Sequence, residues 1–215
     1  MANDCAREVF SCALRVARLE PNGVPDPGDD NLYVSDALTT LTVEPVIVEG
    51  EEIEVKNACG EVCVNVKDCD RLKRLDLTLG LCYPDPELLE LLAGGSVLTS
   101  GDAVGYAFPE LGSAGCPNGV SVELWAKRWE GTSGSQHATF PYSWYVLPKT
   151  FWQHSTRTFE NGPVTVELSG FAVENENWFD GPLNDWPVAS DRVMQSIPTA
   201  TIPEAACGYQ PIAVS

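Results

Sequence analysis

The sequence predicts a mainly β fold, a β-sandwich or barrel with one short flanking α-helix. Apolar and polar residues alternate over many short segments, and one segment alone has the periodicity and the end signals of a helix. Clusters of Gly, Pro, Asn and Asp separate these segments. Eight or nine strands and one helix in 215 residues are typical of a layered β domain.

Strands are expected first in the segments where the alternation has a period of two. These segments lie around residues 14–17, 40–44, 52–56 and 62–67. Between the first two lies PNGVPDPGDD, residues 21–30, with three Pro and three Asp. We expect an exposed excursion there, a long acidic loop over residues 20–31, because this composition does not suit a tight hairpin turn.

A strand and a helix follow one another in RLKRLDLTLGLCYPDPELLELLAGG, residues 71–95. The leucines at 75, 77, 79 and 81 alternate with mostly polar residues, which predicts a half-buried strand. Asp85 can cap a first turn, Pro86 suits position N1, and Gly94 can end the helix in a left-handed conformation. The prediction is a helix over about Pro86–Ala93 whose leucine stripe lies against a sheet.

Later strands are expected around residues 120–127, 142–147 and 164–169. The alternation stops near Asn175, so we expect a β domain over residues 1–175 and an extended C-terminal arm over residues 176–215. The arm contains too many large apolar side chains for a free tail. It should therefore pack on its own domain or on a neighbouring subunit.

The formal net charge is −18, from 31 acidic and 13 basic residues. Residues 20–61 contain eleven acids and one base, and residues 160–215 contain eight acids and one base. Tight nucleic-acid binding needs clustered Lys and Arg, so this composition argues against it, although an acidic surface that repels DNA is available. Solubility alone is the simpler interpretation of the acids. The charged N-terminus and the lack of a long apolar run predict a protein made in the cytoplasm without a membrane segment.

No catalytic or cofactor-binding constellation is evident in the sequence. The two histidines, His137 and His154, lie in no recognisable triad pattern, and no G-x-S-x-G turn or phosphate-binding glycine motif occurs. Pairs of carboxylates occur as often as this many acids would give by chance. We expect no enzymatic activity and no cofactor.

The eight cysteines leave several interpretations open. Cys59, Cys63 and Cys69 could in principle hold a metal, but their spacing is not that of a zinc knuckle. Buried free thiols are the expected state, followed by disulfides formed after export and then by a metal site.

Six tryptophans raise the alternative of a carbohydrate-binding or adhesion module. Trp125 lies on the polar side of its strand, where such a module would place a sugar-stacking ring. Subunit interfaces also bury aromatic residues, so this feature does not separate the two interpretations.

The order of elements resembles the major tail tube proteins of long-tailed, siphovirus-type bacteriophages, in particular those of actinobacterial hosts. The similarity covers about residues 13–187: the N-terminal ALRVARL strand, the acidic Pro/Gly excursion, the KRLDLTLGLCYPDPELLELLAGG unit and the late SGFAVENENWFDGPLNDWP segment. The resemblance implies a β-sandwich that forms hexameric rings, which stack into a hollow tube with an acidic lumen for genomic DNA. It also implies a structural role without enzymatic activity, metal or cofactor, and a location in the virion tail.

The resemblance also implies partners and contact residues. The partners are other copies of the chain, the tape measure protein and further tail proteins, while DNA passes without specific binding. Some family members have an additional C-terminal immunoglobulin-like domain, for which this chain is too short. Contact between subunits is expected from the acidic loop and the C-terminal arm, at Pro21, Asp26, Asp29, Asp30, Trp178, Phe179, Trp186, Ile197, Ile202 and Tyr209. A minor tail or joining protein is a second possibility within the same class of particle.

Overall fold

The computed structural model describes residues 7–112, 118–130, 134–159, 161, 164–180, 182–183 and 192–212. Its elements in chain order are β1 (Arg7–Arg18), β2 (Gly28–Ser35), β3 (Leu38–Val48), β4 (Glu52–Lys56), β5 (Val62–Lys67), β6 (Arg71–Cys82), α1 (Pro86–Ala93), β7 (Ser96–Ser100), β8 (Ala103–Ala107), β9 (Val120–Trp129), β10 (Tyr142–Thr158), β11 (Thr165–Val173), the 3₁₀-helix η1 (Glu176–Asp180), β12 (Gln195–Thr199) and β13 (Gln210–Ile212). The mainly β class with one α-helix is confirmed.

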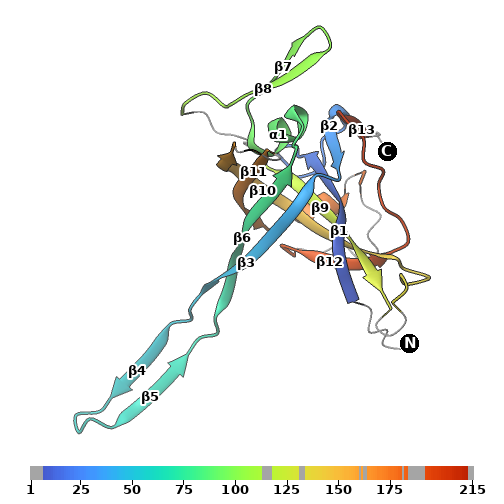
Figure 1. Ribbon diagram of the computed structural model, residues 1–215. Helices are drawn as coiled ribbons and strands as arrows, with labels where there is room; N and C mark the ends of the chain where they lie inside the picture. The colour runs from blue at the N-terminus through green and yellow to red at the C-terminus, as the bar shows by residue number, and fades with distance from the viewer. Residues whose placement is uncertain are drawn as a thin grey trace.

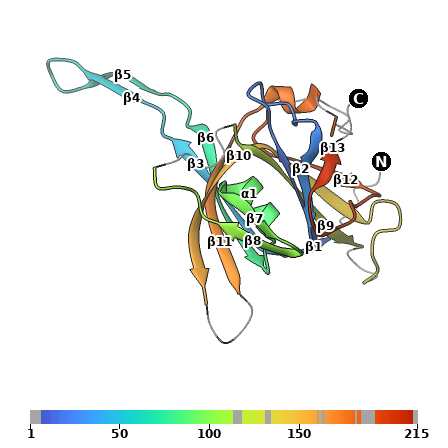
Figure 2. The ribbon, with the colours of Figure 1, turned by 90° about the horizontal axis from the view of Figure 1, so that it is seen from above.

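Nine strands form one large antiparallel sheet that curls around α1 (Figures 1 and 2). Their order is β13-β2-β1-β9-β10-β11-β6-β3, and β12 pairs with β10. The long strand β10 pairs with β9 and β12 through its first half and with β11 through its second half. The sheet therefore has two parts, β13-β2-β1-β9 and β11-β6-β3, joined through one continuous strand.

The main core lies between the concave face of the sheet and α1. Leu88, Leu89, Leu91 and Leu92 of the helix are all buried, and they pack against apolar residues of β1, β6, β9, β10 and β11. The predicted alternation of β6 is confirmed, because its leucines from 75 to 81 are buried while the residues between them are half-buried. This packing gives the helix its stability, since eight residues are too few for a stable isolated helix.

The ends of α1 differ from expectation at two residues. Pro86 occupies the first turn, as predicted. Gly94 ends the helix with a positive φ of 73°, but its ψ of −161° lies outside the left-handed helical conformation predicted for it. Asp85 is in the N-cap position but its side chain caps no backbone N–H group. Its carboxylate instead accepts a hydrogen bond from the Tyr33 hydroxyl of β2, which ties the start of the helix to the sheet.

A second cluster of buried residues covers the opposite face of the first part of the sheet. Trp125 and Trp144 stack there with ring centroids 5.5 Å apart, and Trp178 and Phe179 of η1 pack in the same cluster. Glu123 is fully buried beneath them and forms an ion pair of 2.6 Å with Arg15. The Trp144 Nε1–H also donates to Glu123, at 2.8 Å, so the buried carboxylate is well paired.

Candidate assembly surface

A two-stranded hairpin extends far beyond the sheet, from the ends of β3 and β6 (Figure 1). This hairpin, residues 49–70, contains β4 and β5. From here on it is called the arm, which is distinct from the C-terminal arm expected over residues 176–215. At its root the Gly50 N–H donates to Asp70 Oδ1 at 3.0 Å, and the Asp68 N–H donates to the Glu51 carbonyl at 2.9 Å. With about nine residues in each half, the arm reaches about 30 Å. Every residue from 51 to 70 is exposed.

One face of the arm is apolar over two successive pairs of the register. Ile53 lies opposite Val66 and Val55 lies opposite Val64, while Val62, which follows the same alternation along β5, lies opposite Lys56 across a register shift. These five side chains are 44% to 59% exposed. At the root, Ile47 and Leu72 face one another in the register and are also more than half exposed. The apolar side chains therefore extend from the sheet along the hairpin without any covering layer in the described chain.

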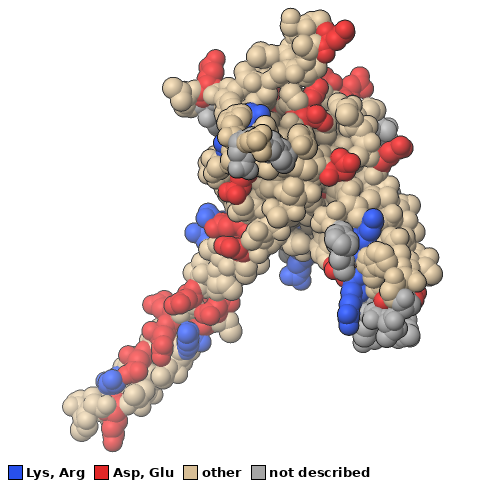
Figure 3. All heavy atoms as spheres, viewed as in Figure 1, with Lys and Arg blue, Asp and Glu red and all other residues tan. Residues whose placement is uncertain are grey.

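The other face of the arm is polar and acidic. Glu52 pairs in the register with Lys67, and Glu54 pairs with Asn65. Residues 49–70 contain seven acids and two lysines, a net charge of −5. Figure 3 shows the acidic side chains along the whole arm. The acids keep the isolated arm soluble, while the apolar face opposite them needs a partner.

The tip of the arm has a defined turn. The Asn57 side-chain oxygen accepts from the backbone N–H groups of Cys59 and Glu61, both at 2.9 Å. Gly60 takes a positive φ of 85°, which suits glycine. A hairpin with an ordered tip and register but no covering layer is only marginally stable in water on its own. Its apolar face is therefore a candidate contact surface.

The sheet also offers an open edge. Among the strands that the structure describes, β3 pairs with β6 alone, so the other edge of Leu38–Val48 is free to pair with another chain. At the opposite end of the sheet, β13 covers β2 with only three residues. Unpaired edges of this length are templates for association with another chain. Pro45 removes one donor from the β3 edge, a position where strands tolerate proline.

The acidic loop expected over residues 20–31 does not project from the domain. Pro21 is exposed in a compact turn, in which the Gly23 N–H donates to the Glu20 carbonyl at 2.9 Å. The Gly23 carbonyl accepts from Asn175 Nδ2 at 2.8 Å. Asp26 is half-buried, and Asp29 and Asp30 lie exposed on β2. Their contact with a neighbouring subunit stays a prediction.

The contact residues predicted after Asn175 lie against the chain's own domain. Trp178 and Phe179 are 0% and 3% exposed. Ile197 on β12 and Ile202 pack on the same cluster, and β12 pairs with β10. Tyr209 packs on the main core, and its hydroxyl donates to Glu90 of α1. Trp186 lies outside the described residues, so its expected contact is untested.

Four of the five tryptophans that the structure describes are too deeply buried to form a sugar-binding platform. Trp125, Trp144, Trp152 and Trp178 are between 0% and 6% exposed. Trp152 lies in the main core, whereas η1 and the segment with Ile197 and Ile202 cover the face on which Trp125 and Trp144 lie. The alternation places Trp125 correctly on the other side of its strand from the main core. It does not reveal that another segment buries that side. The observation that favoured a carbohydrate-binding module is thereby removed.

Cys59, Cys63, Cys69, Cys82 and Cys207 are free thiols. The expected burial is wrong for Cys59, Cys63 and Cys69, which are all exposed on the arm. No group of His, Cys, Asp or Glu in the described ranges is arranged to hold a metal ion.

The histidines serve local packing contacts. The Tyr106 hydroxyl donates to the Gly94 carbonyl at 2.6 Å. His154 Nε2 lies 2.7 Å from the oxygen of the same hydroxyl. Burial lowers the pKa of His154, and the nearby Arg157 lowers it further. The His137 ring accepts from the backbone N–H groups of Thr139 and Phe140.

Comparison with known families gives no match to a family model. The curated proteins give no match either. No helix in the described part of the chain combines the length and the apolar character that a bilayer crossing needs.

Two solved structures show a distant likeness to the chain. One is a chain of the sheath–tube complex of an extracellular contractile injection system, PVC, in the extended state, with 11% identity, a TM-score of 0.28, and coverage of 73% of this chain and 88% of that one. The other is a chain of the anti-feeding prophage (AFP) baseplate, with 10% identity, a TM-score of 0.31, and coverage of 90% and 97%. TM-scores this low decide nothing about function, which has to be inferred from the arm and the sheet edge.

Proposed function

We propose that the chain is a structural subunit of a phage tail tube, in which hexameric rings stack into a hollow tube for the passage of genomic DNA. The arm supports this proposal most directly, because five half-exposed Val and Ile side chains on one face of a hairpin have no covering layer in the described chain. Fully burying such a side chain is worth about 1.5–3 kcal/mol. In an assembly of identical subunits, each arm would gain this free energy by contacting the next copy.

The open β3 edge supports the ring in the same proposal. When the β3 edge of one copy pairs with the second half of β10 in the next, on the side where β9 pairs only as far as Thr150, the strands β10-β11-β6-β3 of each copy join around a closed ring. The arm then reaches beyond its own ring to the adjacent one. A net charge of −18 per copy keeps the free protomer soluble before assembly.

The proposed role requires no catalysis and no cofactor. It places the protein in the virion tail after synthesis in the host cytoplasm, with further copies, the tape measure protein and other tail proteins as partners. A siphovirus of an actinobacterial host is the proposed source, from the sequence resemblance. A minor tail or joining protein would use the same edges in a single ring without stacking.

Electron microscopy and sedimentation of the purified full chain test this proposal. We expect rings and tubes whose abundance rises with protein concentration. A variant in which Asn-Gly replaces residues 49–70 should remain folded by circular dichroism, because every residue from 51 to 70 is exposed, but should form no tubes. Single rings without stacking would favour the joining protein. A monodisperse monomer at high concentration would contradict the proposal.

A further inference from the structure

One broad face of the sheet stays open and is unusually rich in hydroxyl groups. It is the convex face of β3, β6, β11 and β10, whose other face is the main core. The register aligns three rows of side chains across these four strands, and the rows define what is called the hydroxyl face below. The rows are Thr40-Gly80-Glu167-Thr156, Thr42-Thr78-Ser169-Gln153 and Glu44-Asp76-Phe171-Phe151. All of these residues are half-buried or exposed.

Charges on the hydroxyl face are few and nearly balanced. Its carboxylates are Glu44, Asp76 and Glu167, and the cations beside the third row are Arg74 and Lys149. The face thus has a net charge of −1, compared with −18 for the whole chain. Most of the negative charge, including a net −5 on the arm, lies elsewhere.

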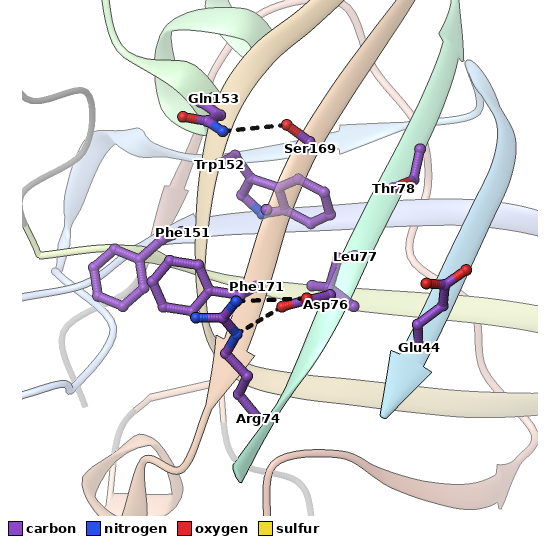
Figure 4. Close-up of a pocket in the computed structure, with 11 residues that line it drawn as sticks. Glu44, Arg74, Asp76, Leu77, Thr78, Phe151, Trp152, Gln153, Ser169 and Phe171 are labelled. Atoms are coloured by element: carbon purple, nitrogen blue, oxygen red, sulfur yellow. Dashed lines mark hydrogen bonds and ion pairs between the residues drawn. The ribbon is translucent and has the colours of Figure 1, made fainter. Parts of the chain in front are cut away.

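Both cations of the face already have partners. Arg74 Nε donates to Asp76 Oδ1 at 2.7 Å, and the guanidinium lies 5.3 Å from the centre of the Phe171 ring. Lys149 Nζ lies 5.6 Å from the centre of the Phe151 ring, and the two phenyl rings stack at 5.1 Å. Figure 4 shows Arg74, Asp76 and the two rings at one side of a pocket of about 400 Å³ in this face. The arrangement leaves no row of extended cations that could hold phosphates.

The position of the face in the fold indicates which way it would point in a ring. The outer face of the other half of the sheet is covered by η1 and by the segment with Ile197 and Ile202. No described residue covers the hydroxyl face in this way, and the face ends at the free β3 edge. Six copies of these four strands would form a barrel of about 24 strands, larger than the porins of about 16–18 strands that already enclose an open aqueous channel.

We infer that the hydroxyl face is the wall of the tube lumen and that passing duplex DNA meets a hydrated, weakly charged surface. This inference rests on the proposed function and changes one part of it, because the lumen expected from the resemblance is acidic. Six copies give only 6 × −1 = −6 per ring on this face. Without free cations there is little counterion release to bind DNA, and beyond about 8 Å the weak negative charge is screened at physiological salt.

Charge reversal on the hydroxyl face tests the inference in assembled tubes. Glu44→Lys with Glu167→Lys raises the face from −1 to +3 per chain, and both residues are exposed, so folding is expected to be unchanged. The matched control is Glu176→Lys with Asp180→Lys, two exposed acids of η1 away from this face. Tubes of each protein are incubated with a short fluorescent DNA duplex, treated with nuclease and pelleted.

We expect the face variant to protect at least about tenfold more DNA from nuclease than wild type or the control, with protection falling as salt rises. Equal protection in the face variant and the control would overturn the inference. Helical reconstruction of the tubes that places the hydroxyl face outside would also overturn it, while the proposed tube would stand. If the wild-type chain forms no tubes, the proposed function fails, and the inference fails with it.

Discussion

The arm's apolar face allows a direct test of assembly that leaves the protomer fold intact. Val55 and Val64 are opposite one another in the register and are 48% and 44% exposed. About half of the burial free energy of a valine is therefore still available at each position, or about 0.8–1.5 kcal/mol. Replacing both by serine should remove about 1.5–3 kcal/mol from each contact. At 1.4 kcal/mol per factor of ten, assembly should need a concentration about 10- to 100-fold higher.

The adjacent register pair offers a matched control. Glu54 and Asn65 are opposite one another on the polar face of the same hairpin. Glu54→Gln with Asn65→Ser therefore also replaces one register pair of the arm, but it leaves the apolar face unchanged. The measurement is the critical concentration from sedimentation at equal salt, with melting temperature as the fold check. We expect the control to assemble like wild type and both variants to melt like wild type. Unchanged assembly of the valine variant, or a lowered melting temperature, would refute the reasoning.

Three further predictions concern the protomer. Glu123→Gln should cost about 3 kcal/mol in urea unfolding, because Arg15 loses its buried partner, whereas Asp36→Asn at an exposed position should cost almost nothing. Leu91→Ala should cost about 2–5 kcal/mol in the same assay, because the side chain is 1% exposed in the main core. Burial and the carboxylate of Glu8 raise the pKa of Tyr145 from 10.0 to about 12. The stability that the protonated Tyr145 hydroxyl contributes is therefore complete below pH 10 and is lost as the pH rises toward 12. Tyrosinate absorbance followed against pH should show a titration near pH 12 in the wild type that Tyr145→Phe lacks.

The strand and helix around residues 71–95 could be predicted because their determinants are local. Alternating leucines define a half-buried strand, while Pro86 and Gly94 define the two ends of α1. The role of Asp85 could not be predicted in the same way. Its partner, the Tyr33 hydroxyl, comes from a strand about 50 residues earlier, and nothing local indicates that contact.

The arm shows why the contact surface could not be found from the sequence. The alternation at residues 52–56 and 62–67 correctly predicts two strands, but alternation states only that one face is apolar. It does not distinguish a face covered by the chain's own core from a face left for a partner. The same limit applies to residues 20–31, where Pro and Asp suggest a free loop although Asn175 ties the Gly23 carbonyl to the domain.

The length of β10 has a mechanical consequence. This one strand of 17 residues pairs with β9 near its start and with β11 near its end, so it belongs to both parts of the sheet. A force applied to one part therefore travels to the other along covalent bonds rather than through side-chain packing. The two parts of the sheet cannot slide past one another without breaking hydrogen bonds along β10, which makes each protomer a stiff building block under load.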